Sequence, residues 1–159
     1  MILTDIVSMI FRTAELVFAA IVAGVNGHYL RMISDTSDWY KARFIYTEVV
    51  AGLAMLLALF WLFPFSGSFV HWPVDLFISI CWFAAFGVLV NYLDGSCGRV
   101  FAWSNMTVLG DNLCGRFKAI IAFSFLSAIC WLVSAIIGFM WVRDHENRYR
   151  RRTWHRSSV

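Results

Sequence analysis

Four ionisable side chains stand inside otherwise apolar stretches of this sequence, and they are the first candidates for chemistry. They are Arg12, Glu15, Glu48 and Asp75. An ionisable group inside a membrane is costly to keep there, so it marks a functional site by default. Arg12 and Glu15 are three residues apart, which places them on one face of a helix, where they can form an ion pair.

Asp75 has two interpretations. It follows Pro73 by two residues, and a proline suits the first helical position while an acid suits the first turn, where free N–H groups and the helix dipole favour negative charge. Asp75 is therefore either a helix-capping acid or a member of a charge cluster with Arg12 and Glu15. Such a cluster would hold the first and third apolar stretches together.

Glu48 also has two interpretations. It lies close to Lys41 and Arg43 in the sequence, which suits an acid paired near the membrane interface. The alternative is a proton or cation site. The middles of all four apolar stretches lack the several polar groups with which a transporter lines its cavity, and this weighs against transport.

The elements that position these charges are four apolar stretches, at about residues 6–30, 44–63, 74–93 and 119–142. Hydrophobic residues make up 60% of the 159 residues and charged residues 14%, against about 25% charged residues in soluble domains. Roughly 20 apolar residues cross a bilayer as a helix, because lipid cannot satisfy free backbone groups. We predict an all-α, four-helix transmembrane bundle over residues 5–143, with no soluble domain, and a basic tail over residues 144–159.

The first stretch is interpreted as a span and not as a cleaved signal peptide. A signal peptide begins with basic residues and continues into an uninterrupted apolar region. Here the basic start is missing, and Arg12 and Glu15 stand where the apolar region would begin.

Patterns that would indicate an enzyme are missing from the sequence. There is no Ser-His-Asp arrangement, no metal-ligand spacing and no glycine-rich phosphate loop. Cys81 and Cys130 lie inside apolar stretches without a Cys-x-x-Cys pair, as expected for thiols that pack as small hydrophobic groups. We expect no catalytic activity, no metal, no cofactor and no nucleic-acid partner.

Charge and cysteine placement predict the orientation in the membrane. Six of the 13 basic residues lie between Arg143 and Arg156, which favours cytosolic termini, although basic residues beside the other connections nearly balance them. The segment between the third and fourth stretches contains Cys97, Cys114 and the glycosylation acceptor pattern at Asn105. A Cys97–Cys114 bridge would persist on the oxidising side and stabilise that segment by roughly 3 kcal/mol.

The tail is a candidate for contact with an anionic cytosolic leaflet, where each basic residue contributes roughly 1 kcal/mol. The alternative is that its charge only sets the topology. The residues concerned are Arg148, Arg150, Arg151, Arg152 and Arg156.

Small residues spaced one helical turn apart predict close helix packing. The pairs are Ala20 with Gly24, Ala54 with Ala58, and Ser134 with Gly138. We expect them inside the bundle, with self-association as the alternative. Trp61, near a span end, is expected to be an interfacial anchor.

Three segments resemble small fungal membrane proteins built on a MARVEL domain, a four-helix membrane module. Lys118, the run Phe123-Ser124-Phe125-Leu126-Ser127 and Trp131 are similar to the fourth span of that family. Asp75 with Cys81-Trp82-Phe83 is similar to its third span, and Arg12 with Leu16-Val17-Phe18 to its first. The resemblance covers about residues 5–143 and implies a role in membrane organisation, with no catalytic residues to carry over.

The expected function is therefore a non-enzymatic organiser of membrane lipids and proteins, in vesicle traffic, membrane apposition or microdomain formation. Expected partners are lipids of the anionic cytosolic leaflet and other membrane proteins, a second copy included. The expected location is the plasma membrane or secretory vesicles. The alternatives are an accessory subunit of a larger membrane complex and a small proton-coupled transporter using Glu15.

Overall fold

Four helices make up the part of the chain that the structure, a computed structural model, describes: residues 2–32, 38–62, 71–96 and 113–156. They are α1 (Ile2–Met32), α2 (Asp38–Leu62), α3 (Trp72–Ser96) and α4 (Leu113–Arg156). Each contains a stretch long and apolar enough to cross a membrane. The predicted all-α, four-span architecture is confirmed.

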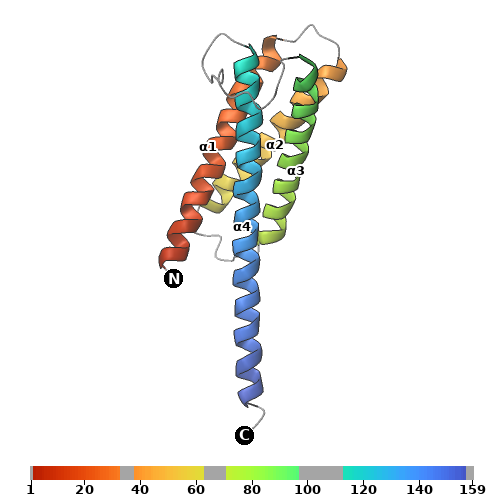
Figure 1. Ribbon diagram of the computed structural model, residues 1–159. Helices are drawn as coiled ribbons and strands as arrows, with labels where there is room; N and C mark the ends of the chain where they lie inside the picture. The colour runs from red at the N-terminus through yellow and green to blue at the C-terminus, as the bar shows by residue number, and fades with distance from the viewer. Residues whose placement is uncertain (1, 33–37, 63–70, 97–112, 157–159) are drawn as a thin grey trace.

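The helices form an antiparallel bundle in which α1 packs against α2 and α4, and α3 packs against α4 and α2. Contact between α2 and α3 is the least extensive of the four, and α1 and α3 lie diagonally opposite. Figure 1 shows both chain ends at the same end of the bundle. We call this the terminal end and the opposite end, toward which α2 begins and α3 ends, the loop end.

Small side chains fill the middle of the bundle. Ala19, Ala51, Ala54 and Ala128 are fully buried, and Trp82 fills the remaining space. Without large side chains between them the helices approach closely, which favours dispersion contacts where no hydrophobic effect acts between helices. The predicted Ala54–Ala58 pair lies in this core, with exposures of 0% and 1%.

The Ala20–Gly24 pair corrects a prediction, because both residues are exposed on the outside of α1. Apart from its chain neighbours and the backbone of its own helix, nothing lies within 4 Å of the position that a Cβ on Gly24 would occupy. The apolar face of α1 that turns inward is set instead by Ala19 and Val22, which are fully buried.

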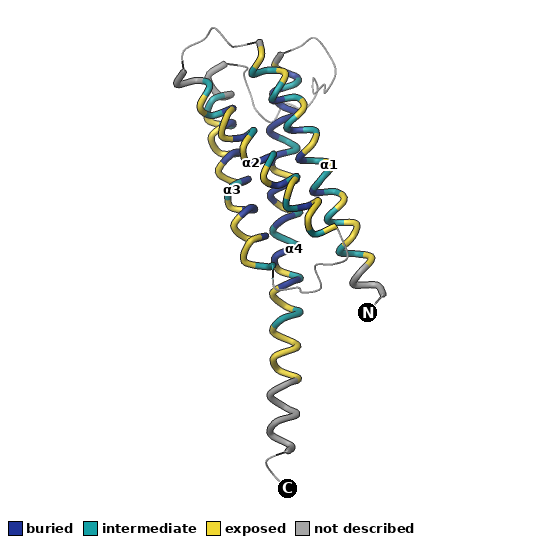
Figure 2. The backbone as a smooth tube through the Cα atoms, turned by 180° about the vertical axis from the view of Figure 1, so that it is seen from behind, coloured by how far each residue is buried: buried dark blue, intermediate teal, exposed yellow. Residues whose placement is uncertain are grey.

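Large apolar side chains cover the outside of the bundle, as expected for a surface in contact with lipid. Leu56, Phe60 and Phe77 are 65%, 77% and 63% exposed. An apolar surface this extensive would be an aggregation liability in water. Figure 2 shows exposed positions along the outer sides of the helices and buried ones facing the axis.

The helices extend beyond the apolar stretches that were predicted from sequence. α4 begins at Leu113 instead of 119 and runs on to Arg156, so residues 144–156 continue the fourth span as one helix. No glycine or proline stands between Phe139 and Arg156, and nothing local interrupts the backbone hydrogen bonds. In Figure 1 this part of α4 projects well past the other helices.

Candidate functional site

Arg12 is the centre of a buried polar group near the terminal end of the bundle. Its Nη1 and Nη2 donate hydrogen bonds to Oδ1 and Oδ2 of Asp75, at 3.1 and 2.6 Å. Nη1 also donates to Oε2 of Glu15 at 2.9 Å. The planar guanidinium matches a carboxylate through two parallel hydrogen bonds, which a lysine cannot do.

Ser134 of α4 completes the polar contacts of Glu15. Its Oγ donates to Oε1 of Glu15 at 2.6 Å. All four oxygens of Glu15 and Asp75 therefore accept a hydrogen bond from within the protein. The side chains of Glu15 and Asp75 are 0% and 3% exposed, so saturation by internal donors is what makes their burial tolerable.

Two tryptophans enclose the guanidinium. The Cζ atom of Arg12 lies 4.5 Å from the ring centroid of Trp61 in α2 and 5.3 Å from that of Trp131 in α4. Both distances suit a cation–π interaction, which strengthens when water is excluded. The Trp61 ring also stacks on His71 at 5.2 Å. Together, Arg12, Glu15, Asp75, Ser134, Trp61 and Trp131 form the Arg12 cluster, to which all four helices contribute.

Glu48 lies apart from this cluster, on the half of α2 toward the loop end. Its Oε2 accepts a hydrogen bond of 2.8 Å from Nδ2 of Asn26, which also donates to the backbone oxygen of Phe44 at 2.9 Å. The hydrogen-bond partner of Glu48 is therefore Asn26 and not a member of the Arg12 cluster. The helix register explains this, since Glu48 lies more than three turns before Trp61, the residue of α2 that reaches Arg12.

Sequence reasoning missed three members of the cluster. Ser134 was assigned to helix packing alone, although serine can bridge helices by a hydrogen bond. Trp61 was assigned to the interface, and its ring instead covers Arg12. Trp131 was noted only for its similarity to the fourth span of the family, with no predicted contact, and it is fully buried. Asn26 was also missed as the partner of Glu48, and a lone amide inside an apolar stretch was the available signal.

Other predicted sites lie partly outside the described residues. Cys97 and Asn105 do so entirely, so the Cys97–Cys114 bridge and the glycosylation site stay predictions. Cys114 is the second residue of α4 and is exposed. Cys81 and Cys130 are free thiols. Within the described ranges, no group of three or more His, Cys, Asp or Glu side chains is arranged to hold a metal.

The basic tail is helical up to Arg156. Arg148 is exposed, and its Nε donates to Asp144 at 3.0 Å, a surface pair of small energetic weight. The side chains of Arg150, Arg151, Arg152 and Arg156 lie outside the described set, so their predicted contact with lipid stays a prediction.

Comparison with protein families gives a match to MARVEL, described as a membrane-associating domain, over residues 5–137. The chain belongs to the MARVEL family. The match contains every member of the Arg12 cluster and ends before the basic part of α4. A comparison with curated proteins gives no match.

MARVEL membership and the four apolar helices make the chain an integral, multi-pass membrane protein. The cluster is built as a clamp within that domain. It joins the diagonal helices α1 and α3 through Arg12 and Asp75, and the neighbours α1 and α4 through Glu15 and Ser134. Because Arg12 pairs with both carboxylates and every carboxylate oxygen accepts an internal hydrogen bond, the arrangement can hold helices in register in a medium where unpaired charges are strongly disfavoured.

Proposed function

We propose that this MARVEL protein is a non-enzymatic organiser of membrane lipids and proteins, acting in vesicle traffic, membrane apposition or microdomain formation. The observation that carries the proposal is the internal saturation of the Arg12 cluster. Buried charges whose hydrogen bonds are all internal stabilise the helix bundle. The apolar exterior of the bundle can then contact lipid and neighbouring proteins.

The same observation argues against a proton-coupled transporter that uses Glu15. A carboxylate that exchanges protons or cations needs an open cavity lined with polar groups. Both oxygens of Glu15 are bound, to Arg12 and to Ser134, and its side chain is fully buried. Arg12 already occupies the position that a transported cation would take.

The orientation belongs to the proposal. The part of α4 from Arg143 to Arg156 contains six arginines, and both termini lie at one end of the bundle (Figure 1). Basic residues next to a span favour the cytosol, so we place both termini there, in the plasma membrane or in secretory vesicles. We further infer that the chain belongs with the small fungal MARVEL proteins, on the strength of the Phe123–Ser127 run and Trp131.

Reconstitution of the full chain into giant vesicles tests the function. Protein and a minor anionic phospholipid carry different fluorophores, and a pH-sensitive dye is enclosed. We expect patches enriched in both protein and anionic lipid. Neutralising Arg148, Arg150, Arg151, Arg152 and Arg156 to Gln should lower the enrichment of the lipid.

The Glu15→Gln variant is the matched control for transport. We expect the same internal pH response to an imposed gradient for this variant and for the wild type. Evenly dispersed protein together with Glu15-dependent proton entry would support the transporter instead. Recovery of a stoichiometric membrane partner after mild extraction, with dispersed protein in vesicles, would support an accessory subunit.

A further inference from the structure

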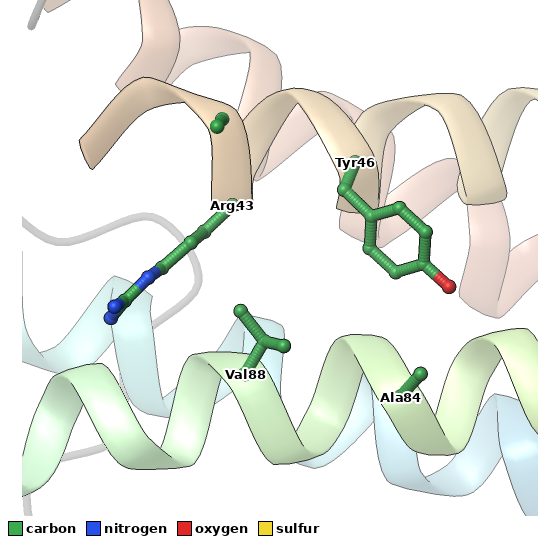
Figure 3. A pocket seen from close by; sticks show the side chains of 5 residues that line it. Arg43, Tyr46, Ala84 and Val88 are labelled. Carbon is green, nitrogen blue, oxygen red and sulfur yellow. The ribbon is translucent and has the colours of Figure 1, made fainter. Parts of the chain in front are cut away.

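A cavity lies between α2 and α3 near the loop end, far from the Arg12 cluster. Its volume is about 300 Å³, and it is lined by Ala42, Arg43, Tyr46, Ala84 and Val88. Such a volume is at the lower end of the range of small-molecule sites, roughly 300–1,000 Å³. Figure 3 shows Arg43 and Tyr46 of α2 facing Val88 and Ala84 of α3 across it.

The cavity is open to the lipid-facing side of the bundle. Tyr46 and Val88 are 38% and 37% exposed, and Ala42 and Ala84 are exposed as well. Ala84 and Val88 are four residues apart and therefore share one face of α3. The short alanine side chains leave a groove here instead of a packed contact, and in a membrane a lipid chain is the solvent that fills it.

The apolar part of the groove offers nothing to hold water. The one hydroxyl, that of Tyr46, already donates to the backbone oxygen of Cys81 at 3.3 Å. A bound water needs two to four polar partners. The alanine and valine side chains provide none, so this apolar part of the groove is suited to hydrocarbon.

Arg43 provides a charge at the membrane interface. It is the third residue of the apolar span that begins at Lys41, and Tyr92 is the last residue of the span in α3. The Cζ atom of Arg43 lies 5.7 Å from the Tyr92 ring centroid. This contact holds the guanidinium at the side of the groove nearest the loop end. Among the described residues no carboxylate forms an ion pair with Arg43.

We propose that this groove binds one phospholipid, with its phosphate on Arg43 and the first part of one acyl chain between Tyr46, Ala84 and Val88. A guanidinium binds a phosphate through two hydrogen bonds. A sterol has only a neutral hydroxyl and offers the guanidinium of Arg43 no negative charge. A helix of another protein, about 10 Å across, needs more room than the groove offers. The site is independent of the organising role and stands even if that role fails.

Native mass spectrometry of the full chain in mild detergent, titrated with phosphatidylglycerol, tests the proposal. Diacylglycerol with the same acyl chains is the probe without phosphate. We expect one tightly held phosphatidylglycerol and much weaker binding of diacylglycerol. Arg43→Gln should weaken the binding at least about tenfold, since a charge-assisted pair is lost and tenfold corresponds to about 1.4 kcal/mol.

Ala84→Leu fills the groove while leaving Arg43 in place, and it should weaken phosphatidylglycerol binding as well. Two matched controls should bind like the wild type. Arg31→Gln removes an exposed arginine at the same end of the bundle, and Ala20→Leu enlarges an exposed alanine outside the groove. A phosphatidylglycerol with a photoreactive acyl chain should label residues 42–46 and 84–88.

Three results would overturn the proposal. The first is unchanged binding in both Arg43→Gln and Ala84→Leu, with gel filtration showing that both variants are folded. The second is a sterol that competes with phosphatidylglycerol and binds Arg43→Gln as well as it binds the wild type. The third is a dimer that Ala84→Leu disrupts, which would assign the groove to a second copy of the chain.

Discussion

Arg12 of α1 and Asp75 of α3 are joined by two hydrogen bonds across the diagonal of the bundle, at 3.1 and 2.6 Å. Their helices are not neighbours in the packing. Because α1 and α3 each pack against both α2 and α4, a contact between α1 and α3 restrains the positions of all four helices. The pair therefore constrains the whole terminal end of the domain.

The hydroxyl of Ser134 should contribute measurably to stability through Glu15. In Ser134→Ala the buried Oε1 of Glu15 loses its donor. We expect a loss of about 1 kcal/mol in the free energy of unfolding, between the small average for hydrogen bonds in membranes and the larger value for bonds to charged groups. The midpoint of SDS-induced unfolding measures it.

Thr13→Ala is the matched control for this prediction. The hydroxyl of Thr13 is exposed and donates only to Met9 of its own helix, at 2.9 Å. Its removal should change the midpoint little. Equal effects of the two substitutions would show that Ser134 contributes no more than a local hydroxyl does.

The four spans could be predicted because their hydropathy is a local property of the sequence. The Arg12–Glu15 pair could also be predicted, since three residues separate the two on one helix. The Ser134–Glu15 contact could not, because the two residues are 119 positions apart and meet only through the packing of α1 against α4. The outward position of Ala20 and Gly24 likewise depends on helix rotation, which small-residue spacing alone does not fix.

The helix ends were harder to predict than the spans. The apolar stretches that predict the spans end at the first charged residues, whereas the helical backbone hydrogen bonding continues through Arg143 into the tail. Propensity decides such an extension, and arginine and glutamate are good helix formers.

The basic part of α4 should bridge two membranes. From Val142 to Arg156 a straight helix extends about 21 Å, well beyond the Debye length of about 8 Å at physiological salt. The outer arginines would then contact an apposed anionic surface. We expect vesicles that contain the protein to cluster with anionic vesicles, with clustering measured by light scattering.

Salt and helix breaking provide the checks on bridging. Clustering should fall as salt rises, and neutralising the five tail arginines from Arg148 to Arg156 should abolish it. Glu146→Pro keeps every arginine but interrupts the α4 helix, and it should also reduce clustering. Clustering that persists at high salt in the neutralised chain would exclude an electrostatic bridge.

Thiol labelling in intact cells tests the orientation and the outer bridge. We expect Cys97 and Cys114 to react with an impermeant maleimide only after reduction, and a cysteine placed at Ser158 to stay protected. Glycosidase treatment should lower the apparent mass if Asn105 is modified. Labelling of the Ser158 position from outside would reverse the orientation and remove the basis for a disulfide.

If the buried charges act as one structural clamp, a double-mutant cycle between Arg12 and Asp75 will show strong coupling between them. SDS-induced unfolding is measured for Arg12→Gln, Asp75→Asn and the double variant. Arg12→Lys is added to show how much the two parallel hydrogen bonds of the planar guanidinium contribute to stability. Breaking a buried pair should destabilise by about 3 kcal/mol or more. We expect the double variant to be hardly less stable than the worse single variant, since each change removes the same contact. Losses that add within about 0.5 kcal/mol would mean that the two charges act independently, and the clamp would be contradicted.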